Sequence, residues 1–367
     1  MPKLNINLAK IKYNAQVLQS FLASKDINFT PVVTAIAGDR EILKVLKQVG
    51  LTEIADSRLA NIQRFGDPDV NFILLKSHAE DCDKEIIQHV KISVQTELTS
   101  IYRLNEVAQT LGTTHQIVLM VDWKDGREGV LTYDVLQYLH EIMSLKHIKV
   151  IGLAFNFMSF KSEAPSDDDI FTMNQFICAV EKELGYRLKL ISGGNSSMLP
   201  QLMYNDLGKI NDLRIGDTLF RGENTTSGQP MPNLYQHAIT LEAQIIEIKP
   251  RVNMETKQSY LQAIVNIGYI DTVTNNIQPM DKELKIIGAS SDYLMIDLNN
   301  QDGYQLGDTI TFTLGHEALT QSMYMRHLEK NYVNDDLINA LIANFDKNTM
   351  RQCHQHHQHL KNKEADQ

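Results

Sequence analysis

The chain has few cysteines, no long apolar run and no excess of positive charge. Only three cysteines, Cys82, Cys178 and Cys353, occur among 367 residues, and none belongs to a C-x-x-C pair. We therefore expect free thiols in a reducing compartment. The net charge of −10 argues against nucleic acid or an anionic membrane as the main partner. Because no apolar run reaches the roughly 18 to 20 residues of a membrane helix, and the first residues lack a signal peptide's apolar stretch, we expect a cytoplasmic protein.

Residues 9 to about 222 alternate between apolar runs and amphipathic helical stretches. Runs rich in Val, Ile and Leu, with helices between them, indicate parallel strands buried on both faces. Right-handed crossovers repeated eight times close into a barrel, so we predict an α/β fold with a (β/α)8 TIM barrel. A doubly wound open sheet is the alternative, but no G-x-G-x-x-G follows the first strand. The predicted strands are residues 29–35, 53–55, 71–76, 91–95, 116–122, 149–155, 188–192 and 211–215, and the predicted helices include residues 40–48, 99–111, 133–143 and 171–183.

The pattern changes after residue 222, where a polar linker at 224–230 precedes strand-like runs without long helices. We predict a barrel over residues 9–228 and a small antiparallel β domain over residues 229–326, which residues 1–8 join as a strand. Residues 327–367 are predicted to form a helical extension, helical to about 351, with a histidine-rich tail at 353–359. We interpret the tail as solvated, with adventitious metal capture as the alternative and no buried metal site. The predicted strands of the β domain are residues 238–248, 261–267, 285–287, 293–297 and 309–314.

Polar side chains follow the last two predicted strands of the barrel, and barrel enzymes carry their reactive groups at such strand ends. Arg214 and Gly216 end the eighth strand, and an arginine followed by a glycine suits an anion or a ring nitrogen. Asn195, Ser196 and Ser197 follow the seventh strand, where small and hydroxyl residues indicate a phosphate cradle. Each signal has a structural alternative, a paired arginine in one case and a helix-capping turn in the other. Together they favour a phosphate site, because barrels often place one after strands seven and eight.

These strings, taken in order, resemble the alanine/ornithine racemase family of fold type III pyridoxal-phosphate enzymes, and most closely its ornithine-racemase-like branch. The resemblance extends to about residue 325 and implies an amino-acid racemase with pyridoxal phosphate as cofactor. It also implies a homodimer in which the β domain of one subunit completes the active site of its partner. The matching segments are residues 55–58 with Asn61, 120–122, 127–129, 191–197, 213–216, 287–292 and 304–308.

The resemblance assigns roles to several residues of this chain. It implies that Arg214 contacts the pyridine nitrogen of the cofactor and keeps that nitrogen unprotonated. Arg127 is expected near the substrate carboxylate or the cofactor O3′, and Asn156 at a polar position that faces the barrel. The residues expected on the phosphate side are Asn195, Ser196, Gly216 and Asp217.

The chain departs from the family at the residue that carries the chemistry. The family's first strand ends in Val-Thr-Lys, and that lysine forms the Schiff base, whereas this chain has Val33-Thr34-Ala35. A methyl group can neither anchor the cofactor nor move the α-proton. A second base, a tyrosine in the family, has no confident match in Tyr260 or Tyr269, and residues 157–162 stand where glycines are expected. We therefore predict a family member without racemase activity that binds pyridoxal phosphate or an amino-acid ligand noncovalently.

Other interpretations stay open. The chain is an active racemase if Ala35 is an engineered Lys→Ala change, or if Lys76, Lys124 or Lys161 replaces the missing amine. A non-catalytic relative that binds a partner protein is a further alternative, since function depends on the site and not on the fold. A barrel enzyme with different chemistry would need a new acid/base pair, for which the candidates are Asp39, Asp56, His78 and Asp122.

Overall fold

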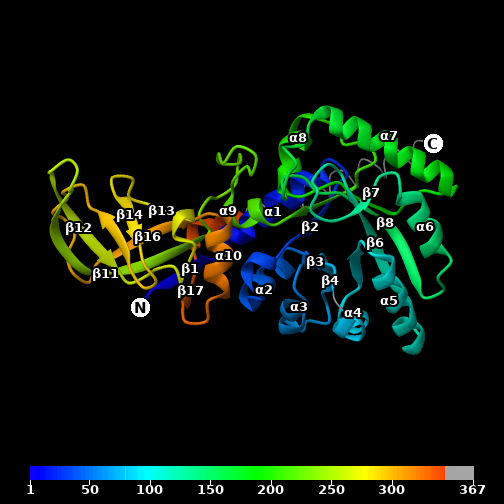
Figure 1. Ribbon diagram of the computed structural model, residues 1–367, viewed down its shortest axis with the longest axis horizontal. Coiled ribbons are helices and arrows are strands. Elements are labelled where there is room, and N and C mark those ends of the chain that lie inside the picture. Colours follow the sequence, from blue (N-terminus) through cyan, green and yellow to red (C-terminus); the bar gives the residue numbers. More distant parts are fainter. Residues whose placement is uncertain (79, 344–367) are drawn as a thin grey trace.

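The computed structural model describes residues 1–78 and 80–343, and it contains a parallel barrel and a separate antiparallel sheet (Figure 1). The barrel strands follow the order β2-β10-β9-β8-β6-β5-β4-β3, and a bridge between Val32 and Ala55 joins the two ends. The predicted (β/α)8 barrel is therefore confirmed. Its strands are β2 (Asn28–Pro31), β3 (Glu53–Asp56), β4 (Asn71–Leu74), β5 (Ile92–Gln95), β6 (His115–Asp122), β8 (Ile148–Ala154), β9 (Leu190–Ser192) and β10 (Asp212–Ile215), with the short β7 (Val130–Leu131) beside β6.

Helices cover the outside of the barrel, and local signals set their ends. Asp39 caps the second helix, because its carboxylate accepts from the N–H groups of Glu41 and Ile42. Ser166 and Asp169 form a capping box at the start of the seventh, and Gly185 ends it with a φ of 74°. The helices are α1 (Leu8–Ala23), α2 (Arg40–Gln48), α3 (Leu59–Phe65), α4 (Asp83–His89), α5 (Leu98–Thr110), α6 (Val135–Met143), α7 (Asp167–Leu184), α8 (Leu199–Tyr204) and α9 (Asp217–Arg221), with 3-10 turns η1 (Thr34–Ile36), η2 (Glu80–Cys82) and η3 (Ser196–Met198).

The interior of the barrel is a packed apolar core. Small and branched side chains from its strands fill it, so ligand chemistry is confined to the strand ends. The buried members are Ala55, Ile73, Ile92, Val94, Val118, Met120, Ile151 and Ala154.

The second sheet is the predicted antiparallel β domain, and the N-terminal strand joins it as expected. Along β11, buried and partly exposed side chains alternate, as they do in a sheet with one solvated face. The strands run in the order β13-β16-β11-β12-β15-β14, and β1 pairs with both β11 and β17. The elements are β1 (Lys3–Asn7), β11 (Ile239–Val252), β12 (Ser259–Val265), β13 (Ile277–Pro279), β14 (Lys285–Ala289), β15 (Leu294–Asp297), β16 (Thr309–Leu314) and β17 (Glu329–Val333), with the turn η4 (Thr274–Asn276) and the helix α10 (His316–Tyr324).

Two predictions about local structure are wrong. Residues 329–333 form strand β17, parallel to β1, where a helix was predicted over 327–351. This pairing satisfies the main-chain groups on the open edge of β1 and outweighs the local helical pattern. A helical segment does begin at residue 336, and the histidine-rich tail lies outside the described residues. The first barrel strand was expected to reach residue 35, but the chain turns into η1 after Val33, because the turn carries Ile36 into the core and Asp39 to the start of α2.

In Figure 1 the β domain lies on the left and the barrel on the right, and α10 lies between them. This helix packs against η1, so the C-terminal domain contacts the segment that contains Ala35. Within the described residues, the structure contains no helix long and apolar enough to cross a membrane.

Candidate active site

Ala35 lies in η1, directly after β2, and its side chain is half-buried. The hydroxyl of Tyr324, from α10, donates to the carbonyl oxygen of Thr34 at 3.2 Å. The hydroxyl oxygen of Thr34 accepts from the N–H of Ser57 at 2.8 Å. The turn is therefore fixed from two sides, and it presents a methyl group where the resemblance implies an amine.

Asp56 and Asn61 support this turn from β3 and α3. The carboxylate of Asp56 has no exposed surface and accepts from the Asn61 amide at 3.1 and 3.2 Å and from the N–H of Arg58 at 2.8 Å. Burial raises the pKa of Asp56 to about 6, against the effect of these donors. The Asn61 amide also donates to the Tyr324 hydroxyl at 2.7 Å. Asp56 thus belongs to a closed network and has no access to a substrate.

The remaining candidates for alternative acid/base chemistry are also engaged. Asp39 caps α2 and accepts from the hydroxyl of Tyr332 at 2.7 Å. Asp122 accepts from two main-chain N–H groups of its own turn, and His78 pairs with Asp83 at 2.6 Å. These contacts give each of the three a structural role.

Arg214 is a buried cation on β10, with 5% of its surface exposed. Its guanidinium donates to the side-chain oxygen of Asn156 at 2.8 Å and to the carbonyl oxygens of Ser192 and Phe155. Burial lowers the pKa of Arg214 to about 10, while the charge of Asp212 opposes that change, so the side chain stays protonated at neutral pH. The structure brings the predicted residues Arg214 and Asn156 together.

Asp212 lies beneath Arg214 and balances its charge. The two side chains are linked through the hydroxyl of Ser192, which accepts from Arg214 and donates to Asp212. Asp212 is 2% exposed and also accepts from the hydroxyl of Thr30 at 2.6 Å. Among the described residues Arg214 therefore has no direct ion pair with a carboxylate: Asp212 reaches it through Ser192, and the guanidinium still contacts Asn156.

The ends of β9 and β10 form one polar surface, which we call the phosphate side and define by Ser196, Ser197, Gly216 and Asp217. The hydroxyl oxygen of Ser196 accepts from the N–H of Thr218 at 3.3 Å and so joins the two loops. Within the described part of the chain, the N–H groups of Ser196, Gly216 and Asp217 have no acceptor, and the buried Ser197 hydroxyl has no partner. Three unpaired donors and an orphaned hydroxyl are the groups that a phosphate requires.

Gly216 and Asn195 shape this surface for structural reasons as well. A Cβ on Gly216 would lie 2.7 Å from the carbonyl oxygen of Val32, so the neighbouring β2 backbone requires the glycine. The Asn195 side chain caps η3 by accepting from Ser197 N–H at 2.9 Å, and it donates to the Phe157 carbonyl at 2.7 Å. Asn195 therefore fixes the loops around the phosphate side and offers no free donor to it.

Asp217 is held between the barrel and the β domain. Its carboxylate accepts from Arg221 at 2.9 Å and contacts Nδ1 of His316, on α10, at 3.0 Å. Burial alone would raise the pKa of Asp217, but the hydrogen bond with His316 and the charge of Arg221 lower it. The sequence analysis missed His316, because no local pattern links residues 99 positions apart.

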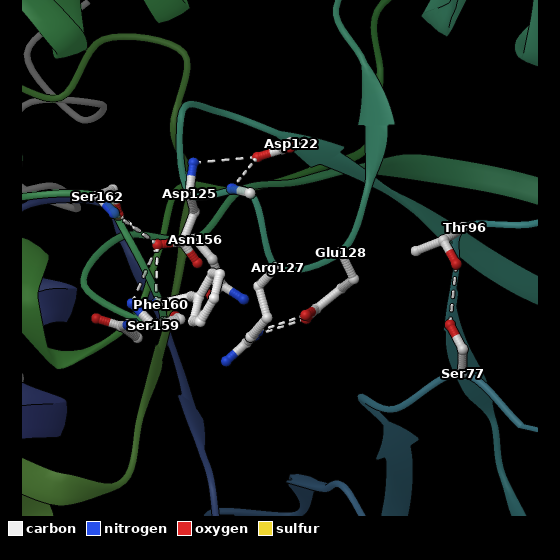
Figure 2. Close-up of polar contacts among 12 residues, drawn as sticks. Ser77, Thr96, Asp122, Asp125, Arg127, Glu128, Asn156, Ser159, Phe160 and Ser162 are labelled. Carbon is white, nitrogen blue, oxygen red and sulfur yellow. Dashed lines mark hydrogen bonds and ion pairs between the residues drawn. The ribbon is translucent and has the colours of Figure 1, made fainter.

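Arg127 and Glu128 lie on the loop after β6, and their side chains point toward each other in Figure 2. The Arg127 guanidinium makes two hydrogen bonds with the Glu128 carboxylate. Both groups are near enough to Arg214 to influence its pKa, Arg127 lowering it and Glu128 raising it. The positive charge of Arg127, which was expected to bind a substrate carboxylate, is thus balanced by the neighbouring carboxylate of Glu128.

Asp125 organises the loop in which glycines were expected (Figure 2). One carboxylate oxygen accepts from the N–H groups of Ser159, Phe160 and Ser162, at 3.1 to 3.2 Å, and from the Ser162 hydroxyl at 2.6 Å. These main-chain donors are therefore committed to a side chain of the protein. The sequence analysis recognised the loop but missed the carboxylate that orders it.

The comparisons with known proteins agree with this geometry. The sequence pattern of the alanine racemase N-terminal domain matches residues 6–223. This chain belongs to the alanine racemase family. Its relatives within the family include the ornithine racemase of Acetoanaerobium sticklandii, 28% identical across 90% of this chain and 99% of the relative, and the lysine racemase of Thermotoga maritima, 24% identical across 90% and 98%.

Solved alanine racemases share the fold of this family member. The enzyme of Clostridium difficile 630 superposes with a TM-score of 0.71 at 19% identity, over 91% of this chain and 96% of that chain. The enzyme of Bartonella henselae, solved with covalently bound pyridoxal phosphate, gives a TM-score of 0.71 at 18% identity, over 90% and 99%. The predicted family and fold are both confirmed.

Proposed function

We propose that this racemase-family protein does not racemise amino acids and keeps a pocket that binds pyridoxal phosphate, or an amino-acid ligand, without a covalent bond. The observation that carries the proposal is the methyl group of Ala35 in η1, at the end of β2. A methyl group offers no nitrogen for attachment and no site for a proton.

Lysines elsewhere near the barrel mouth have other roles. The ammonium of Lys124 donates to Asp169 at 2.6 Å, and that of Lys161 lies 5.3 Å from the centre of the Phe160 ring. Lys76 follows β4 and is exposed. These positions support the loss of covalent attachment, because each ammonium is paired with another side chain or solvated.

The tyrosine nearest to position 35 is also a poor base. The hydroxyl of Tyr324 donates to Thr34 and accepts from Asn61, and burial raises its pKa. Tyr269 is 58% exposed on the β domain, away from any acceptor side chain of the described residues. Neither tyrosine supplies a base within this subunit.

The residues present fit a noncovalent phosphate ester of pyridoxal. The unpaired N–H groups of the phosphate side would hold the phosphate, and Arg214, fixed by Asn156, would face the ring nitrogen. When bound, pyridoxal phosphate supplies a ring that withdraws electrons from an attached amino acid. This chain would contribute binding and orientation only, because its buried carboxylates Asp56 and Asp212 are enclosed.

We also propose that the chain forms a homodimer through the β domain. The loops that carry Tyr269 and Ser290 are joined by a main-chain hydrogen bond of 2.9 Å. Exposed apolar side chains gather on these loops, and such clusters mark contact surfaces. They are Tyr269, Ile270 and Tyr293.

The decisive experiment measures binding and covalent attachment separately. The full-length protein is titrated with pyridoxal phosphate by fluorescence, then reduced with borohydride and weighed intact by mass spectrometry. We expect saturable binding without a stoichiometric mass increase, and no racemisation of ornithine, lysine, alanine or serine.

Arg214→Met is the control for nonspecific reaction of surface lysines. An adduct that forms in the unaltered chain and is lost in Arg214→Met, with that variant shown to be folded, would contradict the proposal and show that the reactive amine lies in the pocket. Racemisation by the unaltered chain would also contradict it. A lack of any binding would refute the pocket and favour the protein-binding alternative.

A further inference from the structure

A charged cluster joins the phosphate side to the β domain. Arg221 donates to Asp217 at 2.9 Å and to Glu223, while His316 contacts the other oxygen of Asp217 at 3.0 Å. The side chains of Asp217, Arg221 and Glu223 are 16 to 20% exposed, whereas that of His316 is 60% exposed. The barrel thus supplies three partly buried charges, and the β domain supplies one accessible imidazole.

The charge of this cluster depends on the protonation of His316, and burial also raises the pKa of Glu223. Asp217 and Glu223 are acidic and Arg221 is permanently cationic, so these three carry a net charge of about −1 near neutral pH. His316 leaves that charge unchanged when neutral and cancels it when protonated. The other charged side chain that acts on His316 is Glu317, its neighbour on α10. Arg221 also acts on His237, whose pKa is lowered by burial, by Lys10 and by Arg221.

This cluster lies against the unpaired donors of the phosphate side. Asp217 contributes its N–H to that surface and its carboxylate to the cluster. A carboxylate beside an oxyanion site repels the oxyanion unless neighbouring cations offset it. Arg221 is shared between two carboxylates, so it offsets Asp217 only in part.

We propose that His316 is a binding residue of the phosphate side and that its protonation sets the affinity of this surface for a divalent oxyanion. The proposal rests on the proposed noncovalent pocket and adds to it a residue from the β domain. The hydrogen bond with Asp217 raises the pKa of His316, although burial opposes it. Oxyanion affinity is therefore expected to rise as pH falls and the imidazole gains its proton.

Sulfate is the appropriate probe, because its charge is constant near neutral pH whereas a phosphate monoester titrates near pH 6. Sulfate binding to the full-length protein is measured by calorimetry at about pH 6 and about pH 8. We expect the affinity to be roughly five- to tenfold higher at the lower pH, the size of one unit charge acting over a few ångströms near a surface. His316→Gln keeps a hydrogen-bonding side chain and should bind weakly at both pH values.

A second readout separates binding from a structural role. By linkage, an oxyanion that binds better to protonated His316 must raise the pKa of His316, which histidine-selective NMR measures with and without sulfate. Tyr324→Phe is the matched control, because it loosens α10 from η1 but leaves the contact between His316 and Asp217. It should keep the pH dependence.

The outcomes distinguish this inference from the proposed function. Sulfate binding with no pH dependence, or a His316 titration that sulfate leaves unmoved, overturns the role of His316 and leaves the pocket standing. If neither sulfate nor pyridoxal phosphate binds at either pH, both proposals fail together.

Discussion

The two sides of the barrel mouth use their polar groups differently. On the phosphate side, three main-chain N–H groups and the Ser197 hydroxyl lack partners within the described residues. At the neighbouring strand end, around Ala35 after β2, the polar groups of Thr34, Asp56, Asn61 and Tyr324 bond to one another. Unpaired buried donors cost stability unless something binds them, whereas a closed network has no such need. The difference indicates that binding and proton transfer occupy separate parts of this site, so one can be lost while the other is kept.

The most direct way to break this comparison is to restore an amine at position 35. If the phosphate side still accepts pyridoxal phosphate, Ala35→Lys should form a near-stoichiometric borohydride-stable adduct where the unaltered chain forms none. Intact mass and peptide mapping to position 35 check this, with Ala35→Met as the control of similar length. An adduct without racemisation would place the second defect at the other proton-transfer group. No adduct would contradict a retained pocket.

Removing the buried cation should damage both binding and stability. Arg214→Met removes the cation that reaches Asp212 through the Ser192 hydroxyl, while Asp212 keeps its hydrogen bonds from Asn28 and Thr30, and losing such a charged hydrogen bond costs about 1.5–3 kcal/mol. Arg127→Met is the matched control, since the Arg127 side chain is 43% exposed and its exposed pairing with Glu128 contributes about 1 kcal/mol or less. Denaturant unfolding measures both. If Arg214→Met and Arg127→Met lose the same free energy of unfolding, the charge of Arg214 is not balanced by Asp212 in solution.

The closed network around Ala35 should make stability depend on pH. Burial raises the pKa of Asp56 from 3.8 to about 6, so between these values the folded state binds more protons than the unfolded state. Stability attributable to Asp56 is therefore present below about pH 4 and is lost as pH rises through about 6, by about 3 kcal/mol in total.

Asp56→Asn removes this dependence, because an amide does not titrate. The difference in free energy of unfolding between Asp56→Asn and the unaltered chain should shift by about 2–3 kcal/mol in favour of the variant from acidic to neutral pH. This shift is expected whether the substitution itself stabilises or destabilises the protein at a given pH. Chemical unfolding at both pH values measures the difference. If the difference in free energy of unfolding between the two proteins is the same at both pH values, Asp56 ionises normally and the network is open to water.

The sequence predicted most of the fold and about half of the site, for physical reasons. The barrel strands could be predicted because they are apolar on both faces. Arg214 and Ser196 lie at the ends of two of them, β10 and β9. Strand β17 was missed because its pairing with β1 is a long-range contact that local pattern does not contain. His316 and Asp125 were missed for the same reason, since each acts on an element distant in sequence. The absence of a lysine at position 35, by contrast, can be read from the sequence directly, because it concerns one residue type at one position.

The smallest expected effect concerns the packing beneath the phosphate side. Gly216 has a φ of −123°, which any residue adopts, but a Cβ there would lie 2.7 Å from the Val32 carbonyl oxygen. Gly216→Ala must therefore separate β10 from β2 slightly, at a cost of about 1–2 kcal/mol typical of overpacking.

The matched control for this change is Gly303→Ala, where an added Cβ meets nothing within 4 Å. Because Gly216 also carries one of the unpaired N–H groups, Gly216→Ala should weaken sulfate binding, whereas Gly303→Ala should leave it unchanged. Calorimetry and thermal unfolding of the two variants test this pair. A loss of stability with sulfate affinity retained would separate the packing role of Gly216 from the phosphate side, because the N–H of Gly216 would then lie outside the oxyanion site.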